Sequence, residues 1–353
     1  MKKVLQIIPH LNLGGAETMC KHLSIALKKA GYDVTVVAFL NEKSKNTLDL
    51  DVAGVSIIYL NKKTGFDISV LQKLRRIIKD LSPDIIHTHL AAIKYAFIAS
   101  LGMKKRIVHT VHSVADQECG RFARFLNKLF LKSKNVTFVA LSEIVAQTIH
   151  EVYKLPIEKI PVVYNGVPLD RCVVKNDWAL QNPVRIANVA GYRPVKNHTE
   201  LILATKLLVE RGYNLKLTLY GDGEERAKIE SLVSQNGLDE IVTLYGFCED
   251  VTSQLHDSDI FVLPSLYEGI SLAIIEAMGT GLPVIASAVG GNPDIITDFE
   301  NGLLCEPIAH SIAEKLEMLI NDNRLRATLG NRAVSSANRF SAENMLKGYL
   351  AIY

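Results

Sequence analysis

Short apolar runs alternate with longer stretches of helical periodicity along the chain, and the alternation occurs in two successive series. Apolar runs of roughly four to eight residues are typical of buried strands, whereas apolar residues recurring at three- and four-residue spacing indicate helices. Alternating strands and helices place successive strands parallel in one sheet, with helices on its faces. The sequence therefore predicts an α/β protein made of two doubly wound, Rossmann-like domains.

The first series predicts helices at residues 16–30, with Gly31 as a stop signal, and at residues 68–81. Its strands are expected at residues 4–8, 34–39, 55–60, 85–87, 106–110 and 138–142. The second series predicts strands at residues 184–189, 215–220, 242–245, 260–263 and 283–286. Its helices are expected at residues 199–211, 224–236, 271–278, 309–319 and 324–337.

Turn-forming residues near the middle of the chain predict the domain boundary. Residues 162–170 include an Asn-Gly pair closely followed by proline, and a polar stretch continues to Pro183. We therefore expect an N-terminal domain at residues 1–168 and a C-terminal domain at residues 169–338. Residues 339–353 are expected to form an amphipathic helix that packs back on the first domain. Ligands of doubly wound folds bind at the carboxyl ends of the strands, so we expect a cleft where the two domains face each other.

Composition and charge exclude several classes of protein. The 353-residue chain is too long for one ordinary core, and its net charge of +3 is too small to indicate nucleic-acid binding. The five cysteines are odd in number and lack zinc-type spacing, which favours a reduced, cytoplasmic compartment. Residues 1–11 resemble a signal peptide, but Gln6, Pro9 and His10 interrupt the apolar run, and we interpret it as the first strand. Charged residues also interrupt the longest apolar stretches, so no membrane-spanning helix is expected.

Two glutamates eight positions apart bracket the most informative segment for chemistry. Glu268 and Glu276 flank the run Gly-Ile-Ser-Leu-Ala-Ile-Ile, which follows the strand expected at residues 260–263. A glycine–serine turn that opens a helix presents backbone N–H groups and the positive end of the helix dipole to an anion. Glu268 would lie at the mouth of such a site, and Glu276 would lie about a turn and a half inside the helix. The segment is therefore a candidate site for a sugar nucleotide.

Two cations on the loop after residues 184–189 are candidates for binding a diphosphate. Arg193 and Lys196 lie in the run Arg-Pro-Val-Lys. Opposite charges about 4 Å apart attract by roughly 4 kcal/mol at an effective dielectric near 20. Attraction that grows as a phosphate departs accelerates the reaction. A solvated surface pair is the commoner fate of such residues, and the sequence leaves both interpretations open.

Glycines follow predicted strands in both domains. Gly14 and Gly15 open the first helix, where bare backbone can approach a ligand, although a tight turn explains them equally well. They do not complete a G-x-G-x-x-G pattern, and the second strand ends without a ribose-binding acid, so NAD binding is disfavoured. Gly221 follows a strand of the second domain and is a candidate contact for a nucleobase or ribose, with an ordinary turn as the alternative.

Histidines cluster near two strand ends of the first domain. His112 comes just after the strand at residues 106–110, where it can hydrogen-bond a sugar hydroxyl. A capping or core role is the alternative for His112. His109 lies within the strand, and His87 and His89 flank the end of another strand. We expect structural roles for these three.

Together these motifs resemble the large family of retaining GT-B glycosyltransferases of the family 4, or group 1, type. The similarity rests on Gly-Gly-Ala-Glu, the strand-end histidine, Arg-Pro-Val-Lys-Asn-His, Tyr-Gly-Asp-Gly, the run Ser-x-x-Glu-Gly that starts at Ser265 and opens the E-x7-E segment, its continuation Ala-Met-Gly-Thr-Gly-Leu-Pro-Val-Ile-Ala-Ser, and Gly-Gly-x-Pro-Asp. These motifs occur in order from near residue 4 to about residue 305. The resemblance implies a hexosyltransferase-type enzyme of bacterial surface polysaccharide assembly, for example of lipopolysaccharide or capsule. It also implies a nucleotide-sugar donor, which we expect to be UDP-linked.

The resemblance further implies a role for each motif residue of the second domain. Glu276 would bind the ribose hydroxyls, and Glu268 would lie at the transferred sugar. Lys196 would bind the diphosphate. Backbone contacts to sugar and phosphate would come from Gly269, Ile270, Ser271 and Leu272.

In the first domain the resemblance implies that Gly15 approaches donor phosphate or acceptor and that His112 contacts the sugar near the reacting carbon. No metal or other cofactor is expected. The chain departs from the family pattern at Gly191, where an arginine commonly stands five residues before the lysine. Either Arg193 replaces the missing charge or fewer cations hold the diphosphate, and we expect that Arg193 replaces it.

Retention without an evident enzymic nucleophile suggests front-face displacement, in which the departing phosphate accepts the acceptor's proton. Glu268 as a covalent nucleophile is the alternative, although its place in a phosphate-binding turn argues against that role. Two other functions stay open on the same scaffold. One is a nucleotide-sugar epimerase or hydrolase, and the other is a non-catalytic nucleotide-sugar-binding protein.

Basic and apolar side chains interleave at helical spacing within residues 121–134. Arg121, Arg124 and Lys128 alternate with Phe122 and other apolar residues. The pattern suits a helix lying on an anionic bilayer, close to a glycan or polyprenyl-diphosphate-linked acceptor at the inner face of the cell membrane. A helix with its apolar face on the core and its lysines in water explains the pattern equally well.

Overall fold

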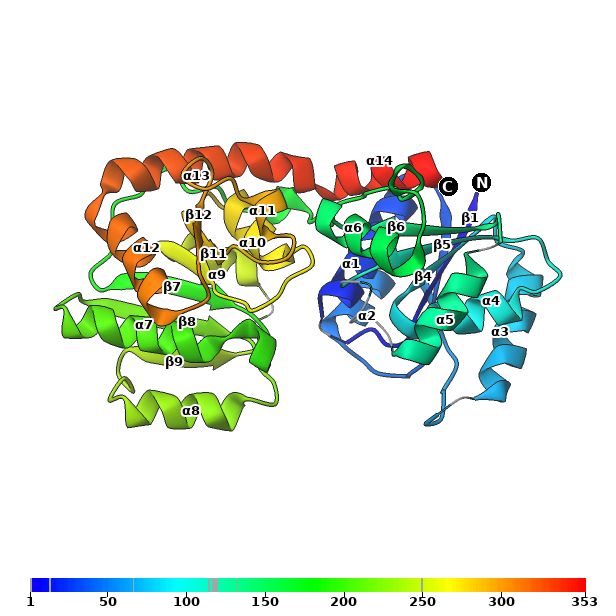
Figure 1. The fold of residues 1–353 in the computed structure, drawn as a ribbon, viewed down its shortest axis with the longest axis horizontal. Coiled ribbons are helices and arrows are strands. Elements are labelled where there is room, and N and C mark those ends of the chain that lie inside the picture. Colours follow the sequence, from blue (N-terminus) through cyan, green and yellow to red (C-terminus); the bar gives the residue numbers. More distant parts are fainter. Residues whose placement is uncertain are drawn as a thin grey trace. The chain divides into compact units, whose positions relative to one another are not determined.

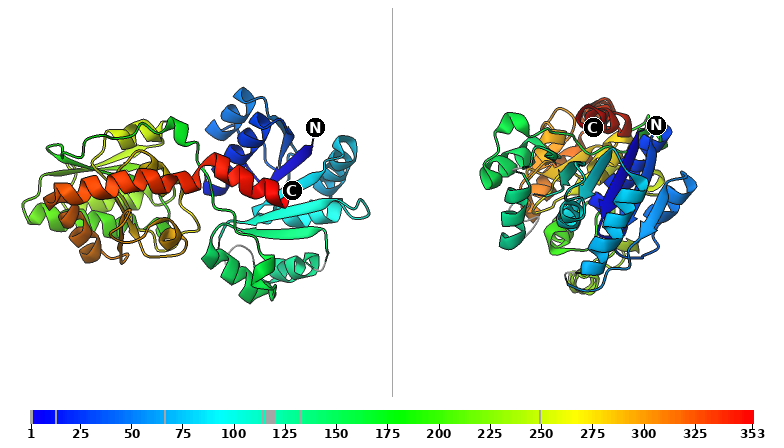
Figure 2. Two further views of the ribbon diagram at one scale, coloured as in Figure 1. Left: turned by 90° about the horizontal axis from the view of Figure 1, so that it is seen from above. Right: turned by 90° about the vertical axis from the view of Figure 1, so that its right-hand side faces the viewer.

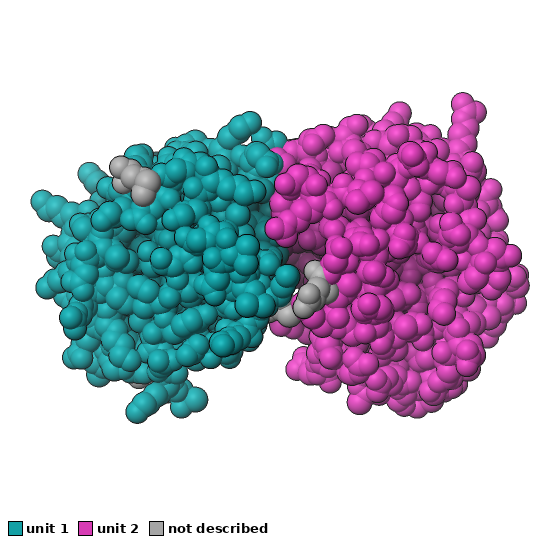
Figure 3. All heavy atoms as spheres, turned by 180° about the vertical axis from the view of Figure 1, so that it is seen from behind, with its two compact units in different colours: residues 1–166, 342–353 teal, residues 167–341 magenta. Residues whose placement is uncertain are grey.

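The chain folds into two compact units, each built on one sheet. The computed structural model describes residues 2–12, 14–65, 67–113, 115, 120–131, 133–248 and 250–353, with only the backbone described for residues 121–123. Unit 1 comprises Met1–Gly166 with Ala342–Tyr353, and unit 2 comprises Val167–Ser341 (Figure 3). Each unit holds a six-stranded parallel sheet. The prediction of an α/β protein with two doubly wound domains is confirmed.

The sheet of unit 1 has the strand order β3-β2-β1-β4-β5-β6. Its strands are β1 Lys3–Ile8, β2 Asp33–Ala38, β3 Ser56–Tyr59, β4 Ile85–His89, β5 Arg106–Val111 and β6 Val136–Ala140. Its helices are α1 Gly15–Lys29, α2 Lys45–Val52, α3 Ile68–Leu81, α4 Ile93–Ala99, α5 Arg121–Phe130, α6 Glu143–Tyr153 and α14 Ala342–Ile352. Helix α1 packs beside α2 and α14, while α3, α4 and α5 form a second row (Figures 1 and 2). All strands of this sheet run in one direction, so their carboxyl ends share one edge.

The sheet of unit 2 has the strand order β12-β11-β10-β7-β8-β9. Its strands are β7 Val184–Val189, β8 Leu215–Tyr220, β9 Val242–Gly246, β10 Ile260–Leu263, β11 Val284–Ser287 and β12 Leu303–Cys305. Its helices are α7 His198–Glu210, α8 Arg226–Gln235, α9 Val251–His256, α10 Leu272–Gly279, α11 Asn292–Ile295, α12 Ala309–Asn321 and α13 Asn323–Ala337. Single 3-10 turns occur at η1 Leu90–Ala92, η2 Ile157–Lys159, η3 Leu169–Arg171, η4 Pro194–Lys196 and η5 Asn338–Phe340.

Helix α3 illustrates how the sequence produces an element and its packing. Asp67 caps the helix because its side chain accepts a hydrogen bond from the Ser69 amide. Val70, Leu74 and Ile78 recur every four residues on one face and are fully buried in the core of unit 1. Burying each such side chain stabilises the fold by roughly 1.5–3 kcal/mol.

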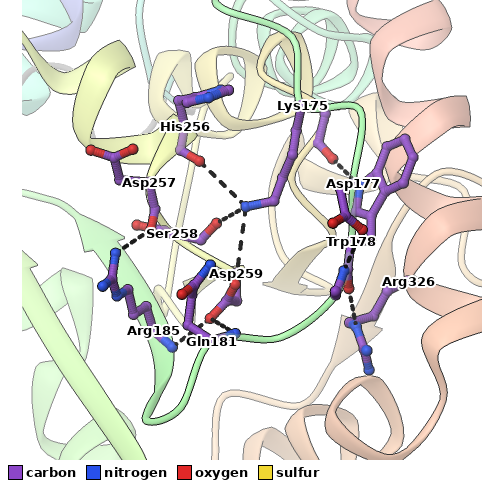
Figure 4. Close-up of polar contacts among 12 residues, drawn as sticks. Lys175, Asp177, Trp178, Gln181, Arg185, His256, Asp257, Ser258, Asp259 and Arg326 are labelled. Atoms are coloured by element: carbon purple, nitrogen blue, oxygen red, sulfur yellow. Dashed lines mark hydrogen bonds and ion pairs between the residues drawn. The ribbon is translucent and has the colours of Figure 1, made fainter.

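The polar stretch before β7 is fixed to unit 2 by partly buried contacts (Figure 4). Lys175 Nζ donates to Ser258 O at 2.6 Å and lies 4.0 Å from Asp259 Oδ1. Asp259 is buried and accepts from the amides of Gln181 and Arg185 through Oδ2, at 3.2 and 2.8 Å. Trp178 Nε1 donates to Gly281 O at 2.8 Å. The stretch therefore belongs to the structure of unit 2.

The C-terminal helix α14 completes unit 1. Tyr349 is fully buried, and its hydroxyl lies 2.7 Å from Thr110 Oγ1. The Tyr353 hydroxyl lies 2.6 Å from His87 Nδ1, and Arg106 donates to the Tyr353 carbonyl at 3.3 Å. These contacts join the end of the chain to strands β4 and β5.

Some elements depart from the predicted ranges for identifiable reasons. Strand β6 begins and ends two residues before the predicted 138–142, because Ser142 instead caps α6 by accepting from the Val145 amide. No range was predicted for helices α2, α4, α6, α9 and α11 or for strand β12. Helix α2 exposes Leu48 and Val52 and buries Leu50, so its apolar pattern is weak. Strand β12 has only three residues. None of the helices in the described ranges is long and apolar enough to cross a lipid bilayer.

Candidate functional site

Glu268 is held in a fixed position beyond the carboxyl end of β10. The Glu268 side chain is 9% exposed. Lys196 Nζ donates to Glu268 Oε1 at 2.6 Å, and Ser265 Oγ donates to the same oxygen at 2.6 Å. A buried carboxylate requires such partners, since burial of an unpaired charge is costly. The structure thus brings Glu268 and Lys196 together.

The loop that carries Lys196 is bound to the loop after β10. The Leu266 amide donates to Val195 O at 2.8 Å. Asn197, in the left-handed region with φ 58°, donates through Nδ2 to Pro264 O at 3.1 Å and Pro307 O at 2.9 Å. Asparagine tolerates this backbone conformation better than most residues. These bonds hold the lysine against the glutamate.

Helix α10 begins at the same edge of the sheet. Ser271 is its N-cap and accepts from the Ile274 amide at 3.5 Å, while Ser271 O accepts from the Ile275 amide at 3.3 Å. No hydrogen bond within the described residues uses the Leu272 or Ala273 amide. Amides in the first turn carry the positive end of the helix dipole, which favours an anion there. Glu276 lies half-buried further along the helix.

Gly290 and Gly291, which follow β11, pack against the backbone of the Glu268 turn. The Gly291 amide donates to Glu268 O at 3.1 Å. A Cβ at Gly290 would collide with Glu268 O, and a Cβ at Gly291 would collide with Gly269 O. The Ser287 hydroxyl donates to Ser265 O at 2.5 Å from the end of β11. Contacts from the end of β11 and from the loop that follows it therefore hold the backbone of residues 265–269 in place.

The other predicted residues of unit 2 lie at the same edge of the sheet, and some are closely packed while others are exposed. Gly191 and Gly221 follow β7 and β8, and a Cβ at Gly221, with φ 144°, would collide with Ala190 O. Gly221 is therefore required by close backbone approach. Arg193 is exposed, and its side chain has no hydrogen bond or ion pair to any residue that the structure describes.

At the edge of unit 1, Gly14 is the N-cap of α1. The Glu17 carboxylate lies against it, since a Cβ at Gly14 would collide with Glu17 Oε2. Glu17 is buried, and its Oε1 lies 3.1 Å from His10 Nδ1. A Cβ at Gly15 would meet nothing within 4 Å. The open approach to this helix end is therefore at Gly15, and a carboxylate already lies beside Gly14.

His112 lies just beyond β5 and is half-buried. Its Nε2 lies 2.9 Å from His89 Nδ1, and His89 Nε2 lies 2.8 Å from Gln6 Oε1. Burial, together with the nearby His109, lowers the pKa of His112 to about 3, so His112 is neutral at pH 7. Burial also holds the pKa of His89 well below its ordinary value.

Helix α5 turns part of its apolar surface outward. Phe125 is 58% exposed and Leu129 is 40% exposed, whereas Phe130 is buried and stacks on Phe97. Arg124, Phe125, Lys128 and Val152 line a shallow hollow of about 350 Å³. The side chains of Arg121 and Phe122, and residue Lys132, lie outside the described residues.

Sequence reasoning found the charged residues of the site and missed the groups that position them. Ser265, Gly290 and Gly291 belong to recognised motifs, but their contacts with the Glu268 turn carry no periodic signal. Gln6 is a buried polar residue within an apolar strand, and that anomaly was visible in the sequence. Among the described residues, no group of three or more His, Cys, Asp or Glu side chains is arranged to hold a metal ion.

Comparisons with known proteins agree with this architecture. The family model described as Glycosyl transferases group 1 matches residues 174–335, and the model described as Glycosyltransferase Family 4 matches residues 13–171. The N-acetyl-alpha-D-glucosaminyl L-malate synthase of Bacillus anthracis is 26% identical over 373 residues, covering 100% of this chain and 97% of that protein.

A second relative and a solved structure extend the comparison. The UDP-Gal:alpha-D-GlcNAc-diphosphoundecaprenol alpha-1,3-galactosyltransferase of Escherichia coli is 30% identical over 259 residues, covering 68% of this chain and 67% of that protein. The crystal structure of Anabaena HepE in complex with UDP and glucose is 18% identical with a TM-score of 0.87, covering 100% of this chain and 99% of that chain. This chain therefore has the GT-B fold, belongs to the group 1 family of glycosyltransferases, and is a glycosyltransferase.

Proposed function

We propose that this glycosyltransferase moves a sugar from a UDP-linked donor to a glycan or polyprenyl-diphosphate-linked saccharide, with retention of anomeric configuration, in bacterial surface polysaccharide assembly. The observation that carries the proposal is the convergence of Lys196, Glu268 and the start of α10 at one sheet edge. The Escherichia coli relative supports the choice of donor and acceptor, because its name specifies UDP-Gal and a diphosphoundecaprenol-linked sugar.

In this proposal unit 2 binds the donor. Lys196 neutralises the diphosphate. The exposed Arg193 supplies the second cation, in place of the arginine that is absent at position 191. The backbone amides of Gly269, Ile270 and Ser271, which lead into α10, and of Leu272, its first residue, bind phosphate and sugar oxygens. Glu276 binds the ribose hydroxyls from inside the helix, and Gly221 lets the nucleoside pack against bare backbone. Glu268 lies at the transferred sugar.

The proposed reaction is a front-face displacement. The bond between the anomeric carbon and the diphosphate oxygen breaks as the acceptor oxygen bonds to the same face of that carbon, and the acceptor's proton passes to the departing phosphate. Lys196 and the α10 dipole stabilise the charge that develops on the leaving group. One Glu268 oxygen already receives two donors, which suits stabilisation of a cationic sugar better than covalent attack. We propose that no metal or other cofactor takes part.

Unit 1 supplies the remaining contacts. Neutral His112 offers a hydrogen bond to a sugar hydroxyl near the reacting carbon. The Glu17 carboxylate beside Gly14 repels phosphate, which favours approach of an uncharged acceptor hydroxyl at Gly15.

A thermal-shift screen of nucleotides and nucleotide sugars tests the donor assignment. A ligand at 100 times its Kd stabilises the protein by about 2.7 kcal/mol. We expect UDP and one UDP-sugar to give such a shift and Glu276→Ala to abolish most of it. A mutant shift equal to that of the wild type would refute the ribose role. Exposed Glu230→Ala on α8 serves as the matched control.

Analysis of the reaction product distinguishes sugar transfer from hydrolysis and from binding without reaction. The anomeric coupling constant of the transferred sugar, measured by NMR, should match that of the donor. Full-rate release of free sugar without acceptor would favour a hydrolase, and UDP binding without any transfer would favour a binding protein. An inverted product would exclude the front-face mechanism.

We further propose that α5 rests on the inner face of an anionic membrane near the lipid-linked acceptor. Exposed Phe125 and Leu129 beside Arg124 and Lys128 combine apolar and cationic contact on one helix. We expect flotation with phosphatidylglycerol vesicles at low salt, lost in Phe125→Ser/Lys128→Glu. The control Lys228→Glu, on an exposed position of α8, should float like the wild type. Equal flotation of the wild type and both variants would mean that α5 does not make the membrane contact.

A further inference from the structure

Helix α2 of unit 1 buries polar side chains and exposes apolar ones. Asn46 is 1% exposed and Thr47 is also buried, whereas Leu48 is exposed and Val52 is 91% exposed. A helix that packs on a core by its apolar face shows the opposite distribution. Natural proteins depart from such local rules mainly where a function requires it. The contacts of the buried polar residues are therefore informative about what α2 does.

Polar side chains at the start of α2 bind the segment that follows β1. Asn46 Nδ2 donates to Asn12 O at 2.7 Å, and Ser44 Oγ donates to Leu11 O at 2.5 Å. These two carbonyls are consecutive along the backbone that leads from β1 to Gly14. The start of α2 therefore fixes the backbone just before the glycines.

The other side of the same glycines is joined to α2 as well. Lys21 lies on the second turn of α1, and its Nζ donates to Asp49 Oδ2 at 3.0 Å. The two side chains are only 9% and 15% exposed, so solvent weakens this ion pair less than it weakens a surface pair. Contacts before Gly14 and after Gly15 thus tie both flanks of the pair to one short helix.

Asn46 makes its bond to Asn12 at a cost in stability. Its Oδ1 is buried and has no hydrogen-bond partner among the described residues. A buried amide oxygen without a partner is destabilising. The opposite orientation of the amide would set Oδ1 against Asn12 O, and neither oxygen can donate, so the orientation with Nδ2 toward Asn12 is the favourable one. A leucine of similar size would avoid the cost, so stability alone does not account for an asparagine here.

We infer that Asn46 and Ser44 are positioning residues, which hold the segment after β1 and, through it, Gly14 and Gly15 in the place that the acceptor approaches. This inference rests on the proposed function, which assigns the acceptor hydroxyl to Gly15. Gly14 O accepts a hydrogen bond from the Thr18 amide at 2.9 Å, at the start of α1. A shift of the segment would move Gly14 and loosen the first turn of α1.

Hydrogen exchange of the full-length, ligand-free protein tests the positioning directly. In Asn46→Leu we expect the amides of residues 18–20 to exchange about fivefold faster than in the wild type, as the loss of roughly one hydrogen bond implies. Strands β1 and β2 and the later turns of α1 should keep their wild-type rates. The melting temperature should equal or exceed that of the wild type, because the buried Oδ1 without a partner is gone.

Two results would overturn the inference. One is an unchanged exchange rate at residues 18–20, and the other is an increase that extends to β1 and β2, which would give Asn46 a general structural role. The matched control is Ser24→Ala, at a fully buried position of α1 away from the glycines, and it should leave the exchange of residues 18–20 unchanged. An increase of the same size in the control would also contradict the positioning role.

Two variants at position 44 provide a second test that does not depend on the folding of Asn46→Leu. Ser44 Oγ also accepts from the Thr47 amide at 3.3 Å, as the N-cap of α2. Aspartate caps a helix as well as serine does, but its carboxylate has no proton for Leu11 O. Ser44→Asp should therefore speed exchange at residues 18–20, whereas Ser44→Thr, which keeps the hydroxyl, should not. Equal exchange rates in these two variants would overturn the role of Ser44.

Transfer assays distinguish this inference from the proposed function. With a radiolabelled UDP-sugar and a polyprenyl-diphosphate-linked saccharide as probes, Asn46→Leu should raise the KM for the saccharide about fivefold. The affinity for UDP should stay unchanged, because UDP is assigned to unit 2. A wild-type KM for the saccharide in Asn46→Leu would contradict the positioning role and leave the proposed function standing. If the wild type transfers no sugar, the proposed function fails, while the exchange rates still decide whether Asn46 positions the glycines.

Discussion

Glu268 Oε1 accepts two hydrogen bonds from neighbouring side chains. Ser265 and Lys196 both donate to it, and Ser265 is fully buried. Removing the hydroxyl leaves a buried carboxylate with one donor fewer, so Ser265→Ala should lower the free energy of unfolding by roughly 1.5–3 kcal/mol. Urea denaturation measures the change. Ser231→Ala, at an exposed position of α8, should change it by less than about 0.5 kcal/mol, and equal effects would contradict the role of Ser265.

Lys196 and Arg193 should contribute unequally to nucleotide binding. Lys196 is ordered by its bond to Glu268, whereas Arg193 is exposed, so any attraction between Arg193 and a bound diphosphate would be screened by solvent and salt. We expect Lys196→Met to weaken UDP binding more than tenfold and Arg193→Met to weaken it severalfold, with the Arg193 effect shrinking at high salt. Isothermal titration calorimetry measures both. An Arg193→Met affinity equal to that of the wild type would mean that fewer cations hold the diphosphate.

At this scale the sequence predicted residue types and not their partners. Glu268, Lys196 and Ser271 were identifiable because an anion site needs charge and a helix start, and both leave a local pattern. That Gly290 and Gly291 would lie against the Glu268 turn depends on how the loops after two different strands pack together. Such contacts have no fixed spacing in the sequence.

The turn between β10 and α10 depends on the element beside it, and a glycine substitution tests that dependence. Gly290→Ala would drive a Cβ into Glu268 O at φ 53°. The turn must then move, so we expect a large loss of thermal stability and of the UDP-induced shift. Gly212→Ala has a similar positive φ of 86° but meets nothing within 4 Å, so it should cost about 1 kcal/mol and leave UDP binding intact. Equal UDP-induced shifts in the two variants would show that UDP binding does not need the close contact between Gly290 and the Glu268 turn.

Elements were predictable where burial imposed a period. Helix α3 and strands β8 and β10 have the predicted bounds, since their apolar residues face a core on one or both sides. Helix α2 and strand β12 are among the elements without a predicted range, because neither carries enough buried apolar residues to leave a pattern. Helix α2 begins with a capping box between Ser44 and Thr47, and β12 pairs with β11.

At the scale of the whole molecule, the two units should respond differently to acid. Burial lowers the pKa of His109 to about 4 and of His112 to about 3, and holds those of His87 and His89 well below 6.5. In unit 2, burial and the charge of Lys196 lower the pKa of His198 to about 4. A histidine whose folded pKa is depressed binds its proton more readily in the unfolded chain. Its stabilisation is therefore complete above about pH 6.5 and is lost as pH falls toward the folded pKa.

Of the five described histidines named above, four lie in unit 1 and one in unit 2, so unit 1 should open first on mild acidification. Each titrating histidine removes up to about 1.4 kcal/mol per pH unit below 6.5. Hydrogen exchange with mass spectrometry at pH 7 and pH 5, expressed as protection factors, should show a greater loss in β4 and β5 than in β7 and β8. His109→Gln should reduce that difference because it removes one of the four groups. Equal losses in both sheets would mean that the histidines of unit 1 accept protons without unfolding.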